Sequence, residues 1–365
     1  MKDRVSKKLL FWGLVAVFSL ALAATASAQP GEFDKKGVLQ PLADGFPKRP
    51  ITLIICDEPG SKDDLYAKAF QTALKDISPV RIITSNEPAN EGGTWFTLKD
   101  IGGREGGNEG YYPIAIVGFF GVATDIFTDP SARELGAKID QLKMVIATET
   151  WPDVMIQRKN APWGPTFAGL IKYMKENPDK ARYISWGVGG GKDIACTYFV
   201  KTLGGSFTKI PQGTAQEAAS TVGAGEGDYN NAPVDVAYAN WKAGRVDVTM
   251  VQGDVVPPPW DKDPNVTTTT KMGLSPAIGG AMFGFGVPSK VPQSHVDWLY
   301  KLFNAAASTE GYLKRGQLIP GLVFTKVGGK MADGAWADNH LREILKNAEP
   351  VVRDLGLHLD YPPAK

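Results

Sequence analysis

The stretch that decides the fold is Ile51-Thr-Leu-Ile-Ile-Cys-Asp-Glu-Pro-Gly-Ser-Lys-Asp-Asp64. Its first six residues, through Cys56, form an apolar and largely β-branched run of strand length. A helix is predicted to follow from about residue 63 to residue 75, so the glycine-containing turn joins a buried strand to a helix. This order of elements is the building unit of α/β domains.

The same alternation continues along the chain. Further strands are predicted at 80–83, 114–117, 144–147, 154–156, 183–186, 246–251 and 281–287. An amphipathic helix is predicted from the spacing of Phe167, Leu170, Ile171 and Met174, with Thr166 placed to cap it. Apolar stripes at 296–303 and 341–348 predict two closing helices, and 255–276 is expected to be a connector. The pattern therefore predicts two α/β domains with largely parallel sheets.

The first 28 residues indicate export. Four basic residues precede an apolar run from Leu9 to Ala24, and the small residues Ala26 and Ala28 flank an expected cleavage site. The run is shorter than the ~20 residues of a membrane-spanning helix. We expect a signal peptide over 1–28, cleaved near Ala28, and a periplasmic location; the alternative is an uncleaved anchor.

The composition narrows the possible partners and cofactors. Forty basic residues nearly balance 39 acidic ones, so no basic face for nucleic acid is expected. Cys56 and Cys196 do not make a disulfide framework. A single bridge between them is possible, but we expect them in different lobes as free, buried thiols. No cofactor or metal is expected.

Two segments share one design, in which a glycine-rich turn leaves a strand and opens a helix. They are Cys56 to Asp64 and Ser185-Trp-Gly-Val-Gly-Gly-Gly-Lys-Asp193. Glycine lets backbone N–H groups approach a ligand closely, and a helix start offers free donors and partial positive charge. Such turns suit a carboxylate, although many α/β proteins contain them for geometric reasons alone. Neither matches a dinucleotide-binding or phosphate-loop pattern.

The chain as a whole resembles the periplasmic solute receptors of the tripartite tricarboxylate transporter family, also called Bug receptors. The segment 46–55 resembles that family's opening, and 57–64 falls on its F-x-A-G-G-x-x-D loop. The segment 85–93 resembles E-N-x-x-G-A-G-G, and 166–178 is close to T-x-x-E-L-I-x-Y-A-K-x-N-P. The second glycine loop, Gly225 to Asp228, Lys242 to Arg245 and Pro264 to Val266 match later motifs in order.

The resemblance implies a two-lobed α/β periplasmic binding protein, type II-like, with two crossover segments near 147–152 and 249–256. The first lobe would comprise 29–147 and 254–365, and the second lobe 148–253. The implied function is not enzymatic: the receptor closes on a small organic solute, most often a carboxylate, and delivers it to membrane permease subunits. We expect it to act as a monomer. The expected ligand-binding residues are Asp57, Glu58, Pro59, Gly60, Ser61, Asp64, Phe119, Gly187, Gly189, Gly190, Asp193, Ala232 and Pro233.

Several of these residues depart from the family pattern. Asp57 and Glu58 replace an aromatic residue and an alanine, Asp193 stands where histidine is common, and Ala232-Pro233 replace polar residues. If Asp57 and Asp193 face each other across a closed cleft, they would repel a polyanion unless paired with Lys62 and Lys192. A solute with an amino or amide group, or a neutral one, is then the alternative. If they face water, a simple carboxylate is expected.

Two other functions are alternatives. One is a ligand sensor for a signalling partner. The other is a secreted hydrolase, but His295, His340 and His358 all lie in the C-terminal region, distant in sequence from both glycine loops. The chain has no G-x-S-x-G or H-E-x-x-H motif. Cys196 near a helix start is expected to serve packing rather than catalysis.

Overall fold

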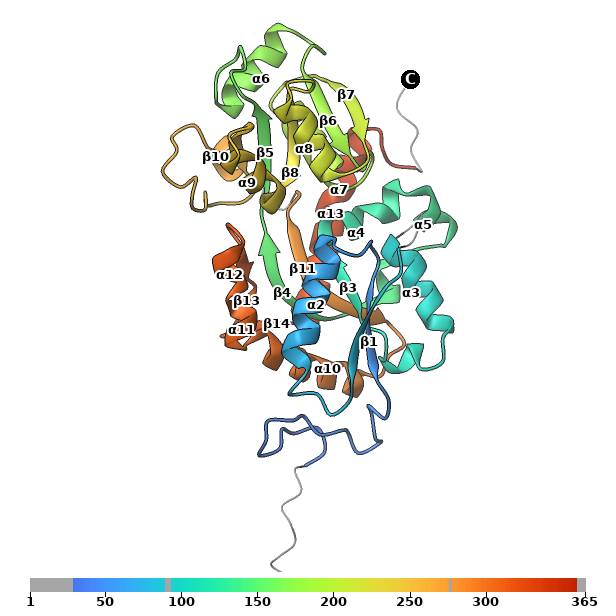
Figure 1. The fold of residues 1–365 in the computed structure, drawn as a ribbon. Coiled ribbons are helices and arrows are strands. Elements are labelled where there is room, and N and C mark those ends of the chain that lie inside the picture. Colours follow the sequence, from blue (N-terminus) through green and yellow to red (C-terminus); the bar gives the residue numbers. More distant parts are fainter. Residues whose placement is uncertain (1–28, 89–92, 276–277, 360–365) are drawn as a thin grey trace, which may run out of the picture.

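Two separate β-sheets form the centres of two lobes. The computed structural model describes residues 29–88, 93–275 and 278–359, so the predicted signal peptide lies outside the described residues. Figure 1 shows one lobe above the other, with the chain passing between them. The two α/β lobes predicted from the sequence are therefore present.

The sheet of the first lobe has the order β13-β14-β4-β11-β3-β1-β2, and β12 also pairs with β4. Strand β1 pairs in parallel with both β2 and β3, whereas β11 runs antiparallel to β3 and β4. The strands are β1 (Ile51–Ile55), β2 (Ile82–Asn86), β3 (Ile114–Val117), β4 (Leu142–Trp151), β11 (Ala281–Pro288), β12 (Val323–Phe324), β13 (Lys326–Val327) and β14 (Lys330–Asp333).

Helices cover both faces of this sheet. On one face, the rings of Tyr66 and Phe70 from α2 contact Phe285 of β11, and Phe303 of α10 joins them. On the other face, α13 packs on α4 and β4. The helices of this lobe are α2 (Lys62–Leu74), α3 (Gly93–Gly103), α4 (Phe119–Thr128), α5 (Pro130–Glu134), α10 (Gln293–Ala307), α11 (Glu310–Leu313), α12 (Arg315–Leu318) and α13 (Gly334–Asp354).

The sheet of the second lobe has the order β10-β9-β5-β8-β6-β7. Its strand β6 pairs in parallel with β7 and β8, and β5 runs antiparallel to β8 and β9. Its elements are β5 (Asp153–Arg158), α6 (Phe167–Glu176), β6 (Arg182–Trp186), α7 (Gly191–Thr202), β7 (Thr208–Gln212), α8 (Ala215–Gly223), β8 (Tyr229–Pro233), α9 (Val234–Lys242), β9 (Val246–Val251) and β10 (Thr267–Thr268).

The two sheets repeat one arrangement. In each sheet, one strand lies between two parallel neighbours: β1 between β2 and β3, and β6 between β7 and β8. In each sheet, an antiparallel strand lies beside a crossing: β11 in the first sheet and β5 in the second. The expectation of largely parallel sheets is right except for these strands and the short hairpin strands β12 to β14.

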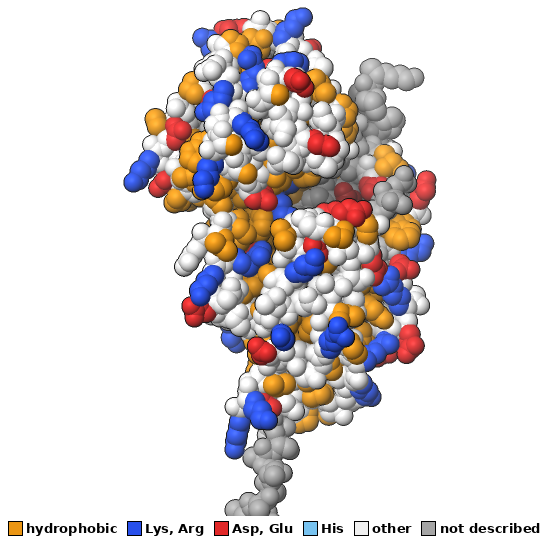
Figure 2. Space-filling view, viewed as in Figure 1, with side chains coloured by type: hydrophobic (Ala, Val, Ile, Leu, Met, Phe, Trp, Pro, Cys, Tyr) orange, Lys and Arg blue, Asp and Glu red, His pale blue; other side chains and the backbone are white. Residues whose placement is uncertain are grey.

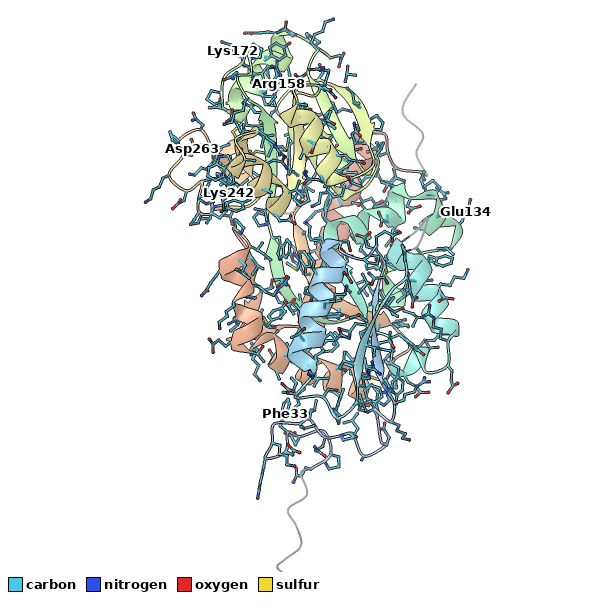
Figure 3. The ribbon with its side chains drawn as sticks, in the orientation of Figure 1. Phe33, Glu134, Arg158, Lys172, Lys242 and Asp263 are labelled. Carbon is cyan, nitrogen blue, oxygen red and sulfur yellow. The ribbon has the colours of Figure 1, made fainter. Side chains whose placement is uncertain are left out.

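The first crossing is short and the second is long. Strand β4 ends at Trp151 and β5 begins at Asp153, with only Pro152 between them. After β9, the connector adds β10 to the second sheet before β11 enters the first, so 254–280 does not lie wholly with the first lobe. The buried Trp260 packs on Trp241 of α9 with ring centroids 5.8 Å apart. In Figure 3, Asp263 of the connector and Lys242 of α9 lie on the same side of this lobe.

The amphipathic helix predicted around 167–174 is confirmed as α6. Its four apolar residues are buried, and the hydroxyl of Thr166 accepts the backbone N–H of Gly169 at 3.0 Å. The boundaries of the lobes stay a proposal. Because β10 pairs with β9, the connector up to β10 is assigned to the second lobe instead of the first. In the described parts of the chain, we find no helix with the length and apolar character of a membrane span.

Candidate functional site

The two glycine loops occupy equivalent positions in the two sheets. The first follows β1 and opens α2, and the second follows β6 and opens α7. Both strands are the ones that lie between two parallel neighbours. In open α/β sheets, ligands bind beyond the carboxyl ends of strands at such points, where neighbouring connections leave toward opposite faces. The topology therefore makes these loops the candidate site.

The first loop is held by Asp64. The backbone N–H of Gly60 donates to Oδ2 of Asp64 at 2.7 Å, and the ammonium of Lys68 donates to the same oxygen at 2.7 Å. Ser61 is the N-cap of α2, with its hydroxyl accepting the N–H of Asp64 at 3.2 Å. Gly60 has a φ of +87°, a conformation that side chains disfavour. These bonds fix the turn at the start of α2.

Asp193 holds the second loop in the same way. The backbone N–H of Gly189 donates to Oδ2 of Asp193 at 3.0 Å, and Lys209 donates to that oxygen at 2.5 Å. The hydroxyl of Ser185 donates to Oδ1 at 2.8 Å. In both loops, a glycine N–H is thus bound by the aspartate four residues later, which is itself paired with a lysine. Because α7 starts at Gly191, its first N–H groups have no acceptor within the helix.

This arrangement corrects the expectation for Asp193. Its side chain is fully buried and both carboxylate oxygens accept hydrogen bonds within the second lobe, so it neither faces Asp57 across a cleft nor points to solvent. Asp57 and Glu58 are exposed, together with Pro59 and Gly60. The Oδ1 atom of Asp57 accepts the N–H of Glu58 at 2.8 Å. The first loop therefore carries its extra charges on its outer side.

Three further expected residues present no exposed side chain. Ala232 and Pro233 lie in β8 and are buried, paired with Val154 and Asp153 of β5. Phe119, at the start of α4, is also buried. It lines a cavity of about 420 Å³ beside the crossings, together with Met282 of β11. Gly92, which matched a family motif, lies outside the described residues.

The two lobes touch where α4 and α7 begin. A Cβ atom added at Gly191 would lie 2.9 Å from Cα of Gly121 and 3.1 Å from Cδ1 of Phe120. The absence of a side chain at Gly191 therefore permits close contact between the lobes. Figure 2 shows the groove between the lobes, with acidic and basic side chains along it.

Two lysines at the helix starts were not among the expected ligand-binding residues. The ammonium of Lys62 lies 5.3 Å from the ring centroid of Trp151 and 5.9 Å from that of Phe283. Within the described chain, no carboxylate forms an ion pair with Lys62. Lys192 forms an ion pair with Asp153, the first residue after the short crossing.

Electrostatic coupling indicates that these charges share one region. Burial lowers the pKa of Lys192, Asp153 opposes that change, and the positive charge of Lys62 lowers the pKa further. Asp235, at the start of α9, also acts on Lys192. Burial, followed by the charge of Asp57, raises the pKa of Asp63 to about 7.

Trp151 is a fixed platform beneath Lys62. It is 2% exposed, and its indole N–H donates to Oε1 of Glu149 at 2.9 Å. Glu149 is buried and pairs with Arg315 at 2.9 Å. Trp151 is the last residue of β4, so its ring, which lies beneath Lys62, is part of the short crossing between the lobes.

The cysteines are free, as predicted, and lie in different lobes. Cys196 is buried on α7, but Cys56 is only half-buried, which corrects the expectation that both are buried. Burial raises the pKa of the Cys56 thiol to about 12 and also raises that of Cys196. Neither thiol is activated for nucleophilic chemistry at neutral pH.

The histidines serve other contacts. His295 bonds to the carbonyl of Glu109 at 2.8 Å and to Oδ2 of Asp44 at 2.9 Å. His340 stacks on Trp336, with ring centroids 4.9 Å apart. Neither is bonded to the glycine loops. In these contacts, neither His295 nor His340 is paired with a nucleophilic side chain.

Comparison with known proteins identifies the family. A family model described as the tripartite tricarboxylate transporter family receptor matches residues 117–315, more than half of the chain. A UPF0065 protein of Bordetella pertussis is 24% identical over 274 residues, covering 74% of this chain and 80% of that protein. The chain belongs to the tripartite tricarboxylate transporter receptor family. The resemblance drawn from the sequence motifs is confirmed.

Solved structures with low sequence identity share the fold of this chain. R. palustris Rpa4515 with adipate has a TM-score of 0.69 at 18% identity, covering 85% of this chain and 98% of that one. MatC from Rhodopseudomonas palustris with bound malate has a TM-score of 0.67 at 19% identity, covering 84% and 100%. The periplasmic binding protein BugD has a TM-score of 0.68 at 17% identity, covering 86% and 99%. The two-lobed binding-protein fold is thereby confirmed.

Proposed function

We propose that this chain is a periplasmic receptor that closes on a small, carboxylate-containing organic solute and delivers it to membrane permease subunits. The observation that carries the proposal is the matched construction of the two loops. Each places a glycine turn and a helix start at the carboxyl end of a parallel strand, and each is fixed by an aspartate–lysine pair. Preorganised backbone donors of this kind suit an anion.

Other features support the same function. Two similar folds were solved with dicarboxylates, adipate and malate. Lys62 adds a cation beside the first loop that forms no ion pair within the described chain. The family's receptors are periplasmic, and we propose export by cleavage near Ala28 and action as a monomer. Mass spectrometry of the exported protein's N-terminus and sedimentation of the purified protein test these two points.

Thermal denaturation of the purified protein tests solute binding. A ligand that binds only the folded protein at 100 times its Kd stabilises it by about 2.7 kcal/mol. We expect some carboxylates to raise the Tm, whereas alcohols of the same carbon skeleton do not. Stabilisation by the alcohols but by no carboxylate would contradict the proposal.

Delivery needs a separate experiment. Uptake of a stabilising carboxylate should fall when the receptor is deleted from its host, and should return when the intact chain is supplied. Undiminished uptake in the deletion strain would contradict delivery to a permease without affecting the binding result.

A further inference from the structure

The side chain of Lys62 is a cation beside the first loop that is available to bind a solute. Lys62 is half-buried above Trp151 and has no ion-pair partner within the described residues. Lys192, the other cation of this region, is already paired with Asp153. Among the residues that the structure describes, this region therefore offers the positive charge of Lys62 to a solute.

Acidic groups lie beside both lysines. Asp57 acts electrostatically on Asp63, the residue that follows Lys62, and Asp235 acts on Lys192. A first carboxylate on the solute can pair with Lys62. A second carboxylate would find no further unpaired lysine at the two described helix starts and would lie near these acids, whose repulsion is strengthened where water is excluded.

Two buried acceptor atoms in the same region lack partners. Asp153 is 1% exposed, and its Oδ1 has no hydrogen-bond partner, although Oδ2 holds Lys192. Oδ1 of Asp235 is likewise buried without a partner. A buried acceptor left unpaired is unfavourable, so a donor that reaches it gains more than a donor in water.

From these observations, we propose that the solute is a monocarboxylate that also carries an N–H donor, amino or amide, with Lys62 holding the carboxylate and Asp153 accepting from the donor. This inference rests on the proposed function and defines its solute class. It excludes dicarboxylates as the preferred ligands.

Length-matched probes test the inference by titration calorimetry. Succinate, succinamate, 4-aminobutyrate and butyrate form one series; adipate, adipamate, 6-aminohexanoate and hexanoate form the other. In at least one series, we expect the amide or amino compound to bind about tenfold or more tightly than both the dicarboxylate and the unsubstituted acid. A dicarboxylate that binds equally or more tightly in both series would overturn the inference and leave the proposed function intact. No binding by any probe would count against both.

Two lysine variants assign the role of Lys62. Lys62→Gln should weaken binding of the preferred probe about tenfold or more while its unliganded Tm stays near that of the parent. Lys75→Gln, at the exposed end of the same helix, is the matched control and should bind as the parent does. Equal affinity of Lys62→Gln and Lys75→Gln would remove Lys62 from the site and overturn the inference.

Discussion

The contact between α4 and α7 predicts that Gly191→Ala weakens solute binding without weakening the fold. The new Cβ would lie 2.9 Å from Cα and 3.0 Å from N of Gly121, both backbone atoms that cannot rotate away. Ordinary carbon contacts begin near ~3.5 Å, so the lobes must separate locally by roughly half an ångström or more. Overpacking of this kind costs about 1–3 kcal/mol. The clash arises only when the lobes are together, so opening removes it.

The expected affinity loss is therefore about 5- to 150-fold, from the same 1–3 kcal/mol. Titration with a stabilising carboxylate measures it, and X-ray scattering should show a smaller contraction on binding than in the parent. The unliganded Tm should not fall, because alanine favours a helix more than glycine does. Gly311→Ala, at a helical glycine with open space around it, is the control. Parent-like affinity and contraction in Gly191→Ala would refute the role of this contact in closure.

Three further predictions concern the loops and thiols. Because burial raises the pKa of Asp63 to about 7, the folded state binds its proton more tightly than the unfolded state, and stability is lost as pH rises from about 4 to 7. Asp63→Asn should thus be more stable than the parent by ~1–2 kcal/mol at pH 8, a value discounted for the partial exposure of Asp63. At pH 4 the two proteins should be equally stable, as measured by urea denaturation. A difference in stability that does not change with pH would contradict this. Gly189→Val, at a φ of +82° in open space, should abolish ligand-induced stabilisation in a folded protein, and an unchanged affinity would exclude the loop from the site. Cys56 and Cys196 should react slowly with a thiol reagent in the native protein and fully after denaturation without reductant; resistance after denaturation would mean that they are bridged.

The apolar elements could be predicted because their sequence pattern and their burial agree. Strand β1 and helix α6 show the spacing that burial of one face requires, and Thr166 caps α6 as expected. Strand β8 was missed because it reads Tyr-Asn-Asn-Ala-Pro, a poor strand sequence. Its asparagines form tertiary hydrogen bonds: the side-chain amide of Asn230 donates to the carbonyl of Ile184, and that of Asn231 donates to the carbonyl of Lys192. Local propensity contains no information about such distant partners.

The sequence predicted the two glycine loops of the candidate site, but it did not predict which side chains lie beside them. Both glycine loops lie at the carboxyl end of a strand with two parallel neighbours. The residues of the short crossing, however, determine which side chains lie beside the loops. Trp151 and Asp153 flank Pro152 at that crossing, and they reach Lys62 and Lys192 through folding alone. Sequence separation gave no signal for these contacts, because the partners are 39 or more residues apart.

The hydrogen-bond partners of Asp193 change how its departure from the family pattern is interpreted. Asp193 looked like a charge added to the cleft, but it repeats the role of Asp64: each binds a glycine N–H four residues earlier and pairs with a lysine. The change from histidine at this position therefore alters how a loop is anchored, not what the cleft offers to a solute. Lys192 and Asp153 are already paired with each other, whereas Lys62 has no ion-pair partner among the described residues. We therefore expect selectivity to depend on Lys62 at the start of α2, while the two glycine loops serve the proposed binding of a carboxylate.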